Sequence, residues 1–274
     1  MADAPPPEIR RLPHEVVTGF VDHAAELMRL GTLRLLLLAI AAGSFIAIGA
    51  MISVTLSLSI QQAGLQRLLL GVGFASGFIL VVISGSALIT EVNVMLPELR
   101  FAHRFAATAA HARFWAIVLL GNIIGALFVG ALFELGDVVG PAEFGRLSQL
   151  IGEKMRFQDD GGRGWIAVVA SGVAGNWLVG MATFLATAAR TISGKILGIL
   201  FPVVGFVALG LQYAPANLGY FSIAQWHGDL GYSWPELVVW NLVPALLGNI
   251  IGAATLVAAL FWFTHGRPED RTSA

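Results

Sequence analysis

The sequence has no cysteine and few charged residues, and each shortage excludes a class of protein. None of the 274 residues is cysteine, which excludes a disulfide framework and a cysteine-based metal site. Asp, Glu, Lys and Arg make up only 12% of the chain, whereas a soluble domain carries about a quarter. The net charge of −1 gives no indication of a nucleic-acid partner. Hydrophobic residues make up 57% of the whole chain, which is typical of one integral membrane domain.

Six apolar stretches are long enough to cross a lipid bilayer, which takes roughly 20 apolar residues. They predict an all-α membrane protein with six transmembrane helices, over residues 33–58, 68–97, 112–135, 165–189, 196–224 and 238–263. We assign residues 30–264 to this channel domain, 1–29 to an N-terminal segment and 265–274 to a C-terminal tail. Residues 136–164 are polar and partly acidic, so we expect this connection to lie outside the bilayer.

The N-terminal segment carries an amphipathic pattern. From His14 to Arg29, apolar residues recur at helical spacing and charged residues lie between them. This pattern predicts a helix that either lies on the membrane surface or packs against the body of the protein.

Two of the apolar stretches are interrupted. Phe201–Tyr220 is too apolar for a loop, but Pro202 and Pro215 disfavour a continuous helix, and a polar patch around Tyr213 lies between them. The second stretch is interrupted at Ser84–Asn93. At membrane depth, a broken segment is tolerated only where it is buried in protein or lines a cavity.

The order of the stretches indicates an internal repeat. Three precede the long connection and three follow it, so the two halves would enter the membrane in opposite senses. The interrupted stretch comes second in each half, with its polar break at Ser84–Asn93 and at Leu209–Asn217. Such a pair points to a central binding site, so we predict an inverted repeat with two interrupted helices that form a permeation site.

Basic residues predict the orientation. Eleven fall on one side of the predicted spans and five on the other, which places both termini in the cytoplasm. The eleven are Arg10, Arg11, Arg29, Arg34, Arg100, Arg104, Arg113, Arg190, Lys195, Arg267 and Arg271, and the five are Arg67, Arg146, Lys154, Arg156 and Arg163.

Signals for catalysis are weak. The six histidines are scattered over termini and connections, and none has a metal-ligand spacing. There is no Ser-His-Asp arrangement or carboxylate pair. We therefore expect neither an enzyme nor a cofactor.

Several stretches, in order, resemble the formate/nitrite transporter family, whose members carry small monovalent anions such as formate, nitrite, hydrosulfide or lactate. The resemblance covers roughly residues 30–264 and rests on GSFIAIGA, GFILVVISGSALIT, LLGNIIGALF, GVAGNWLVGMATFLATAARTISGKILGILFP and FVALGLQYAPAN. It implies a homopentamer of aquaporin-like protomers in the bilayer, each with its own pore. Small residues such as Gly43, Gly49, Gly121 and Gly125 would permit the close helix contacts.

The resemblance also implies site residues. Thr90 would lie on the first interrupted loop, and Asn176, in the fourth span, would face it. Their polar side chains can bind a carboxylate or cap a freed backbone group. We expect Asn93 and Asn217 to form hydrogen bonds with backbone groups of the loops. For Asn217, the alternative is that it lines the pore. The family's two hydrophobic constrictions would fall at Phe74, Phe78, Leu88 and Phe206.

Two positions depart from the family pattern. Tyr213 stands where the family usually has a central histidine, and a tyrosine, with an unperturbed pKa of about 10, mostly exchanges hydrogen bonds instead of protons. An ungapped count places the family's lysine near Asp160, with Arg163, Arg156 and Lys154 as displaced candidates. Both departures concern the handling of charge and protons.

Glu91, directly after Thr90, is the carboxylate that we place in the interior of a predicted span. Ionisable residues inside a membrane are rare and are by default a functional hypothesis. Glu91 could repel anions, relay protons or favour a cation such as ammonium. Alternatively, it holds the loop through an ion pair with Arg100 or Arg104.

These observations predict a channel or secondary transporter in the cell inner membrane for a small monovalent weak-acid anion. A bare anion is very costly in hydrocarbon, so we expect proton-linked passage as the neutral acid. One alternative is a pore for a neutral or cationic solute, such as water or ammonium. Another is a membrane scaffold or sensor whose pore no longer conducts.

Overall fold

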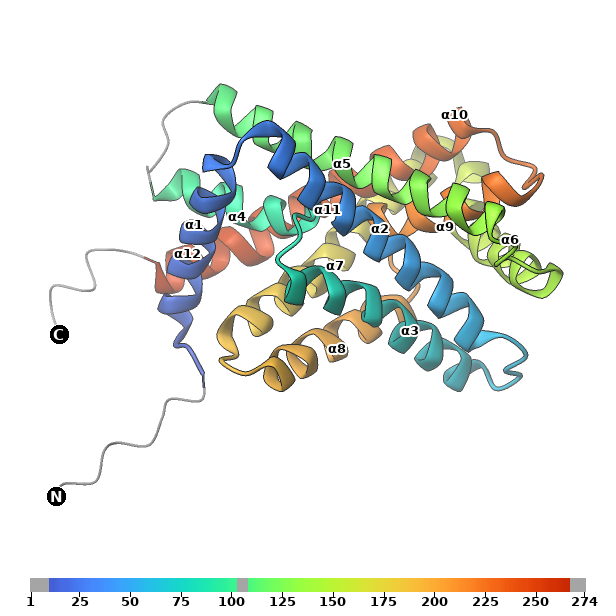
Figure 1. Cartoon of the computed structure of the whole chain (residues 1–274), viewed down its shortest axis with the longest axis horizontal. Helices are drawn as coiled ribbons and strands as arrows, with labels where there is room; N and C mark the ends of the chain where they lie inside the picture. Colours follow the sequence, from blue (N-terminus) through green and yellow to red (C-terminus); the bar gives the residue numbers. More distant parts are fainter. Residues whose placement is uncertain (1–9, 103–107, 267–274) are drawn as a thin grey trace, which may run out of the picture.

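The computed structural model describes residues 10–102 and 108–266, and this part of the chain is built of helices (Figure 1). The prediction of an all-α protein is therefore confirmed for the described residues. In chain order, the helices are α1 (Pro13–Arg29), α2 (Thr32–Ser57), α3 (Ala63–Ser84), α4 (Ile89–Phe101), α5 (Thr108–Leu135), α6 (Pro141–Met155), η1 (Arg156–Asp160), α7 (Gly161–Ala188), α8 (Ile192–Ala208), α9 (Ala214–His227), α10 (Trp234–Leu237), η2 (Val238–Leu242), α11 (Val243–Gly252), η3 (Ala253–Ala259) and α12 (Leu260–His265).

Five helical segments are long and apolar enough to cross a membrane. They are Thr32–Ser57, Ala63–Ser84, Thr108–Leu135, Pro141–Ala188 and Trp234–His265. The fifth predicted span, 196–224, which we expected to be interrupted, corresponds to two shorter helices, α8 and α9, neither of which is among these five segments. The count of six transmembrane helices therefore stays a prediction.

Close packing in both halves depends on glycine. A Cβ at Gly43 of α2 would lie 2.1 Å from the carbonyl oxygen of Asn122 in α5. A Cβ at Gly248 of α11 would lie 2.2 Å from the carbonyl oxygen of Val169 in α7. No side chain fits at either point, so the helix pairs α2–α5 and α7–α11 approach as closely as small residues allow.

These two helix pairs share a sequence that our repeat prediction did not use. The octapeptide LLGNIIGA occurs at 119–126 in α5 and again at 246–253, from α11 into η3. The α5 copy packs on α2 and the α11 copy packs on α7. The two halves of the chain therefore repeat one arrangement.

The first helix and the long connection both pack on the body. α1 buries Val16, Val17, Phe20 and other apolar residues against α4, α7 and α12, so it takes the second of the two predicted positions. The connection 136–164 contains α6, which buries Leu147 and Ile151 and packs on α9. Figure 1 shows α1 and α6 at opposite ends of the molecule.

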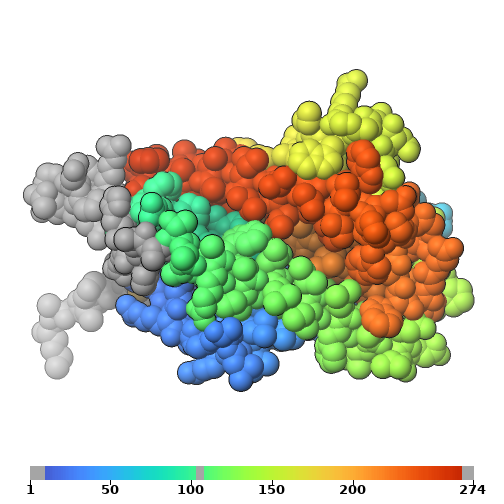
Figure 2. All heavy atoms as spheres, turned by 90° about the horizontal axis from the view of Figure 1, so that it is seen from above, coloured from blue at the N-terminus to red at the C-terminus, as the bar shows by residue number. Residues whose placement is uncertain are grey.

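One face of the molecule is distinctly apolar. Figure 2 shows α5, in green, beside the C-terminal helices, in orange and red. Between them is a cavity of about 490 Å³ with a lining that includes Leu119, Ile123, Trp234 and Leu246. Leu120, Phe128 and Val239 are exposed on the same helices. Such a surface suits a lipid or protein environment instead of water.

Candidate functional site

The polar breaks predicted from the sequence are short non-helical turns between consecutive helices. The first separates α3 from α4, and the second separates α8 from α9. Gly85 and Gly210 each have φ of +69°, the left-handed conformation that glycine adopts without steric cost. The two turns therefore end their preceding helices in the same way, at corresponding places in the two halves.

Two asparagines of the repeated octapeptide hold these turns. Asn122 accepts a hydrogen bond from the Ile89 backbone N–H at 2.8 Å, and its amide donates to the carbonyls of Ala39 and Ala87. Buried backbone groups freed by a broken helix must find such partners.

The second half repeats this arrangement. Asn249 accepts from the Ala214 backbone N–H at 2.9 Å and donates to the carbonyls of Gly172 and Gln212. Neither asparagine is among the predicted site residues, although the repeated octapeptide in the sequence marks both.

The two turns meet at a pair of hydroxyl groups. The side-chain oxygens of Thr90 and Tyr213 lie 2.5 Å apart, and both residues are buried. Thr90 lies in the first turn of α4 and not on the loop where we predicted it, and Tyr213 immediately precedes α9. The structure therefore brings together these two predicted site residues, one from each half.

Aromatic rings pack around this hydroxyl pair. The centroid of the Tyr213 ring lies 5.2 Å from that of Phe206 and 6.3 Å from that of Phe74, and the two phenylalanine rings are 5.5 Å apart. Phe78 and Leu88 are buried in the same apolar cluster. All four predicted constriction residues therefore lie in the core that contains Tyr213.

A cavity lies on each side of this aromatic core. We call the first the α1-side vestibule; it measures about 710 Å³ and is lined by residues of α1, α3, α4, α7 and α8. We call the second the α6-side vestibule; it measures about 300 Å³ and is lined by residues of α3, α6, α8 and α9. Phe206, which packs on Tyr213, lines the α6-side vestibule, and Glu91, next to Thr90, lines the α1-side vestibule, so the hydroxyl pair lies between the two linings.

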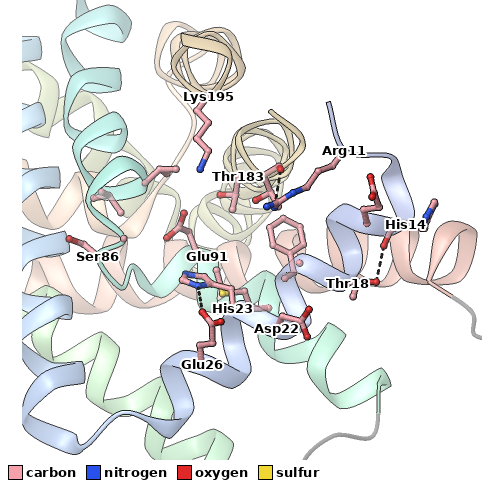
Figure 3. A pocket seen from close by; sticks show the side chains of 18 residues that line it. Arg11, His14, Thr18, Asp22, His23, Glu26, Ser86, Glu91, Thr183 and Lys195 are labelled. Carbon is pink, nitrogen blue, oxygen red and sulfur yellow. Dashed lines mark hydrogen bonds and ion pairs between the residues drawn. The ribbon is translucent and has the colours of Figure 1, made fainter. Parts of the chain in front are cut away.

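Glu91 faces the α1-side vestibule. Figure 3 shows its carboxylate between Lys195 of α8 and His23 of α1, and Glu91 is 6% exposed. Burial lowers the pKa of the His23 imidazole; the Glu26 carboxylate opposes this effect and the Lys195 ammonium adds to it. Arg100 has an interaction of its own, and Arg104 lies outside the described residues. Glu91 therefore shares this vestibule with Lys195 and His23.

We call the aromatic core around Thr90 and Tyr213 the barrier, and Lys154 lies on its α6 side. Lys154 of α6 donates from its ammonium nitrogen to the carbonyl oxygen of Leu211 at 2.7 Å. Its own carbonyl accepts from the side-chain amides of Gln212 and Asn241 at 3.3 and 3.1 Å. Of the three displaced candidates for the family's lysine, Lys154 is the one that contacts the second break, whereas Arg156 lines the same vestibule.

The α6-side vestibule is strongly basic. Its charged lining residues are Arg67, Arg146, Lys154 and Arg156, with Glu153 as the acidic one. In contrast, the α1-side vestibule mixes Arg11 and Lys195 with Glu15, Asp22, Glu26 and Glu91. Four of the five basic residues that we counted on one side of the membrane thus gather around a single cavity.

Two predicted pore residues lie behind the vestibule walls. The amide of Asn217 donates to Gln212 and Asn241 at 2.8 and 2.7 Å, and that of Asn176 donates to the Asn249 carbonyl at 2.8 Å. The Oδ1 atoms of Asn176 and Asn217 are buried and have no hydrogen-bond partner within the described residues. Neither residue lines a vestibule, so their role in the pore stays a prediction.

A second buried carboxylate lies on α4. Glu98, one residue beyond the end of the predicted span, is fully buried, and neither carboxylate oxygen has a hydrogen-bond partner among residues 10–102 and 108–266. Glu91 and Glu98 are seven residues apart and so share a face of the helix. Asn93, on the same helix, accepts a hydrogen bond from the Trp115 indole at 2.9 Å.

Known proteins match this chain over almost its whole length. The family model described as formate/nitrite transporter matches residues 14–263. A probable formate transporter of Methanothermobacter thermautotrophicus is 33% identical over 248 residues, which cover 85% of this chain and 89% of that protein.

Solved structures match the fold. An FNT family ion channel aligns with a TM-score of 0.81 at 22% identity and covers 91% of this chain and 98% of its own. A pentameric formate channel with formate bound aligns with a TM-score of 0.71 at 22% identity, covering 86% and 98%. The chain therefore belongs to the formate/nitrite transporter family and is a membrane transport protein, not an enzyme.

Proposed function

We propose that the protein conducts a small monovalent weak-acid anion of the formate, nitrite or hydrosulfide type across the cell inner membrane, linked to protons. The observation that carries this proposal is the Lys154 ammonium, held at the second break at the base of a basic vestibule. The 33% identical relative named as a probable formate transporter supports formate as the first solute to test.

Desolvation sets the physical problem. An anion that leaves water for an apolar barrier loses its hydration, and an uncompensated buried charge is very costly. The α6-side vestibule compensates this cost up to the barrier, because four basic side chains surround the cavity. Beyond it lie Phe74, Phe206 and Tyr213, so we infer that the solute crosses as the neutral acid.

The hydroxyl pair is the polar feature inside the barrier. Thr90 and Tyr213 can each donate or accept a hydrogen bond, so they can exchange their mutual bond for bonds to a neutral acid. Glu91 stands beyond them in the α1-side vestibule and can exchange a proton with the arriving solute. Asn217 helps to hold the second turn through its bond to Gln212, and Asn176, with its unpartnered Oδ1 among the described residues, stays a predicted pore residue.

Orientation and assembly are part of the proposal. The excess of basic residues on the α1 side supports both termini in the cytoplasm, so the α6-side vestibule faces outward. A solved channel of this fold is described as pentameric, which supports a homopentamer in the bilayer.

A second candidate solute is neutral or cationic, such as water or ammonium. Glu91 favours it, because this carboxylate would repel an anion beside the barrier. Tyr213 favours it as well, because a tyrosine does not supply a proton near neutral pH.

Flux measurements in proteoliposomes test the proposal. We expect uptake of formate, nitrite or hydrosulfide that rises as the external pH falls, and little uptake of ammonium or water. Ammonium or water flux without anion flux would replace the first candidate with the second. Proteoliposomes that pass none of these solutes would instead indicate a scaffold or sensor.

A further inference from the structure

A second cation lines the α6-side vestibule at a different depth from Lys154. Arg146 precedes Lys154 by eight residues on α6, so the two lie on one face of the helix about 12 Å apart along its axis. Lys154 contacts the turn before α9, at Leu211. Arg146 shares the cavity wall with Tyr220, two turns further along α9 than Tyr213. Arg146 therefore stands farther from the barrier than Lys154.

The guanidinium of Arg146 has unused donors. Its Nε atom is buried and has no hydrogen-bond partner within the described part of the chain. Its Nη1 atom donates to Gln149 at 3.3 Å, and none of the ion pairs in the described residues includes Arg146. An unsatisfied buried donor is destabilising, so the guanidinium gains by turning this N–H toward an anion in the cavity.

The neighbouring hydroxyls do not fill this role. Ser53 donates to the Ala50 carbonyl at 2.6 Å, so the Ser53 oxygen is left to accept the Tyr220 proton across their 3.0 Å contact. Tyr220 therefore presents its ring and an acceptor oxygen to the cavity, and it has no second proton to give an anion. Of Ser53, Tyr220 and Arg146, only Arg146 has donors left for an anion.

We propose that Arg146 forms an outer binding station for small carboxylates and similar two-oxygen anions, distinct from the position of Lys154. A guanidinium binds a carboxylate through two parallel N–H donors, which a lysine cannot do. The inference rests on the proposed function, because it concerns the same solute before it reaches the barrier.

The size of the cavity gives this station a second property. A volume of about 300 Å³ accommodates anions larger than formate, whereas the rings of Phe74, Phe206 and Tyr213 close the way beyond. A carboxylate such as propionate then occupies the station without passing the barrier. External propionate should therefore compete with formate.

Uptake kinetics in proteoliposomes test the station. In Arg146→Gln we expect the half-saturating formate concentration to rise about tenfold, the scale of a lost bond to a charged group, with the maximal rate within about twofold of wild type. Inhibition by propionate should weaken in parallel. Arg146→Lys keeps the charge but loses the paired donors, so we expect an intermediate increase.

A matched control is Arg163→Gln, since Arg163 is an exposed arginine at the start of α7 that does not line this cavity. Its kinetics should equal those of wild type. In Lys154→Met, in contrast, we expect the maximal rate to fall.

Binding measured without transport keeps the inference separate from the proposed function. Saturation-transfer NMR of the full-length protein in detergent, titrated with formate and then with propionate, gives the dissociation constants directly. We expect about tenfold weaker binding of both anions in Arg146→Gln. Equal constants in wild type and Arg146→Gln would overturn the station, whether or not the protein transports formate. Absence of formate flux in wild type would overturn the proposed function and leave the NMR result to decide the station.

Discussion

Tyr213 is the residue at which the two interrupted segments meet, because its hydroxyl lies 2.5 Å from that of Thr90. Tyr213→Phe keeps the ring packing and removes this bond. We expect a protein less stable by about 1 kcal/mol, the net value of one hydrogen bond, with reduced formate flux. Thermal unfolding in detergent and proteoliposome uptake measure the two effects.

Tyr213→His addresses selectivity instead of stability. Histidine titrates near neutral pH, so this variant places a proton donor inside the barrier. We expect formate or nitrite flux to increase and to acquire a step in its pH dependence between about pH 6 and 7. If neither Tyr213 variant changes rate, selectivity or pH profile, Tyr213 only packs the barrier and the pore is controlled elsewhere.

Glu91 tests the role of charge on the other side of the barrier. If its carboxylate hinders anions, Glu91→Gln should raise formate flux and flatten its pH dependence, because a like charge has been removed. Glu26→Gln is a suitable control, since Glu26 lines the same vestibule with a side chain that is 74% exposed. A loss of stability together with all fluxes would show instead that Glu91 holds the loop.

At the residue scale, the sequence indicated the side chains of the aromatic core more fully than the positions of the charged side chains around it. Thr90, Tyr213 and Phe206 lie at the helix ends that frame the turns, and Phe74 packs on Tyr213 and Phe206 from the middle of α3. Their role as a pore constriction stays a prediction. The lysine could not be placed by counting, since α6 and η1 fold back and bring Lys154 to Leu211.

The turns between helices depend on two glycines with the same conformation. Gly85 and Gly210 have φ of +69°, and a Cβ at either position would meet no atom within 4 Å. Alanine there costs conformational energy alone, about 1–2 kcal/mol. We therefore expect lower thermal stability in Gly85→Ala and Gly210→Ala. Gly145→Ala, in an open position of α6, should be neutral or stabilising, and equal melting of all three variants would contradict this account.

The asparagines that hold the turns should matter more than the glycines. Asn249→Ala leaves the Ala214 N–H and the carbonyls of Gly172 and Gln212 without their side-chain partner. Each unsatisfied buried group costs about 1–3 kcal/mol, so we expect a large fall in melting temperature. Asn122→Ala should behave alike, because its three bonds are equivalent. If only one of these two variants has a lower melting temperature, the two halves of the protein do not contribute equally to stability.

The helices were easier to predict than their connections. Long apolar runs identify α2, α5 and α7 directly, because a bilayer requires about 20 apolar residues whatever the fold. α6 escaped prediction because it is amphipathic and lies in a stretch with a polar average, although its buried face packs on α9. Sequence averages do not distinguish such a helix from a loop outside the membrane.

At the scale of the whole molecule, the duplicated arrangement explains how one barrier separates two cavities. Each half supplies one turn, one asparagine clamp and one side of the hydroxyl pair, so the site exists only where the halves meet. The predicted inverse orientation of the halves is not needed for this conclusion. The two halves share one arrangement of helices and turns, but the side chains that line the two vestibules differ in charge.

Assembly is the last prediction. Gly43, Gly121 and Gly125 do not support it, because their close contacts lie within one chain, against Asn122, Ala39 and Ile40. The exposed apolar face of α5 and the C-terminal helices, together with a solved pentameric channel of the same fold, supports association instead. We expect native mass spectrometry in detergent to give five copies of the 29.0 kDa chain. A stable monomer or tetramer would refute the pentamer. Phe128 is 56% exposed on α5. If this face is the subunit interface, replacing Phe128 by a charged residue should lower the mass of the assembly below that of five chains. A pentamer that survives this replacement would place the subunit contact on other helices.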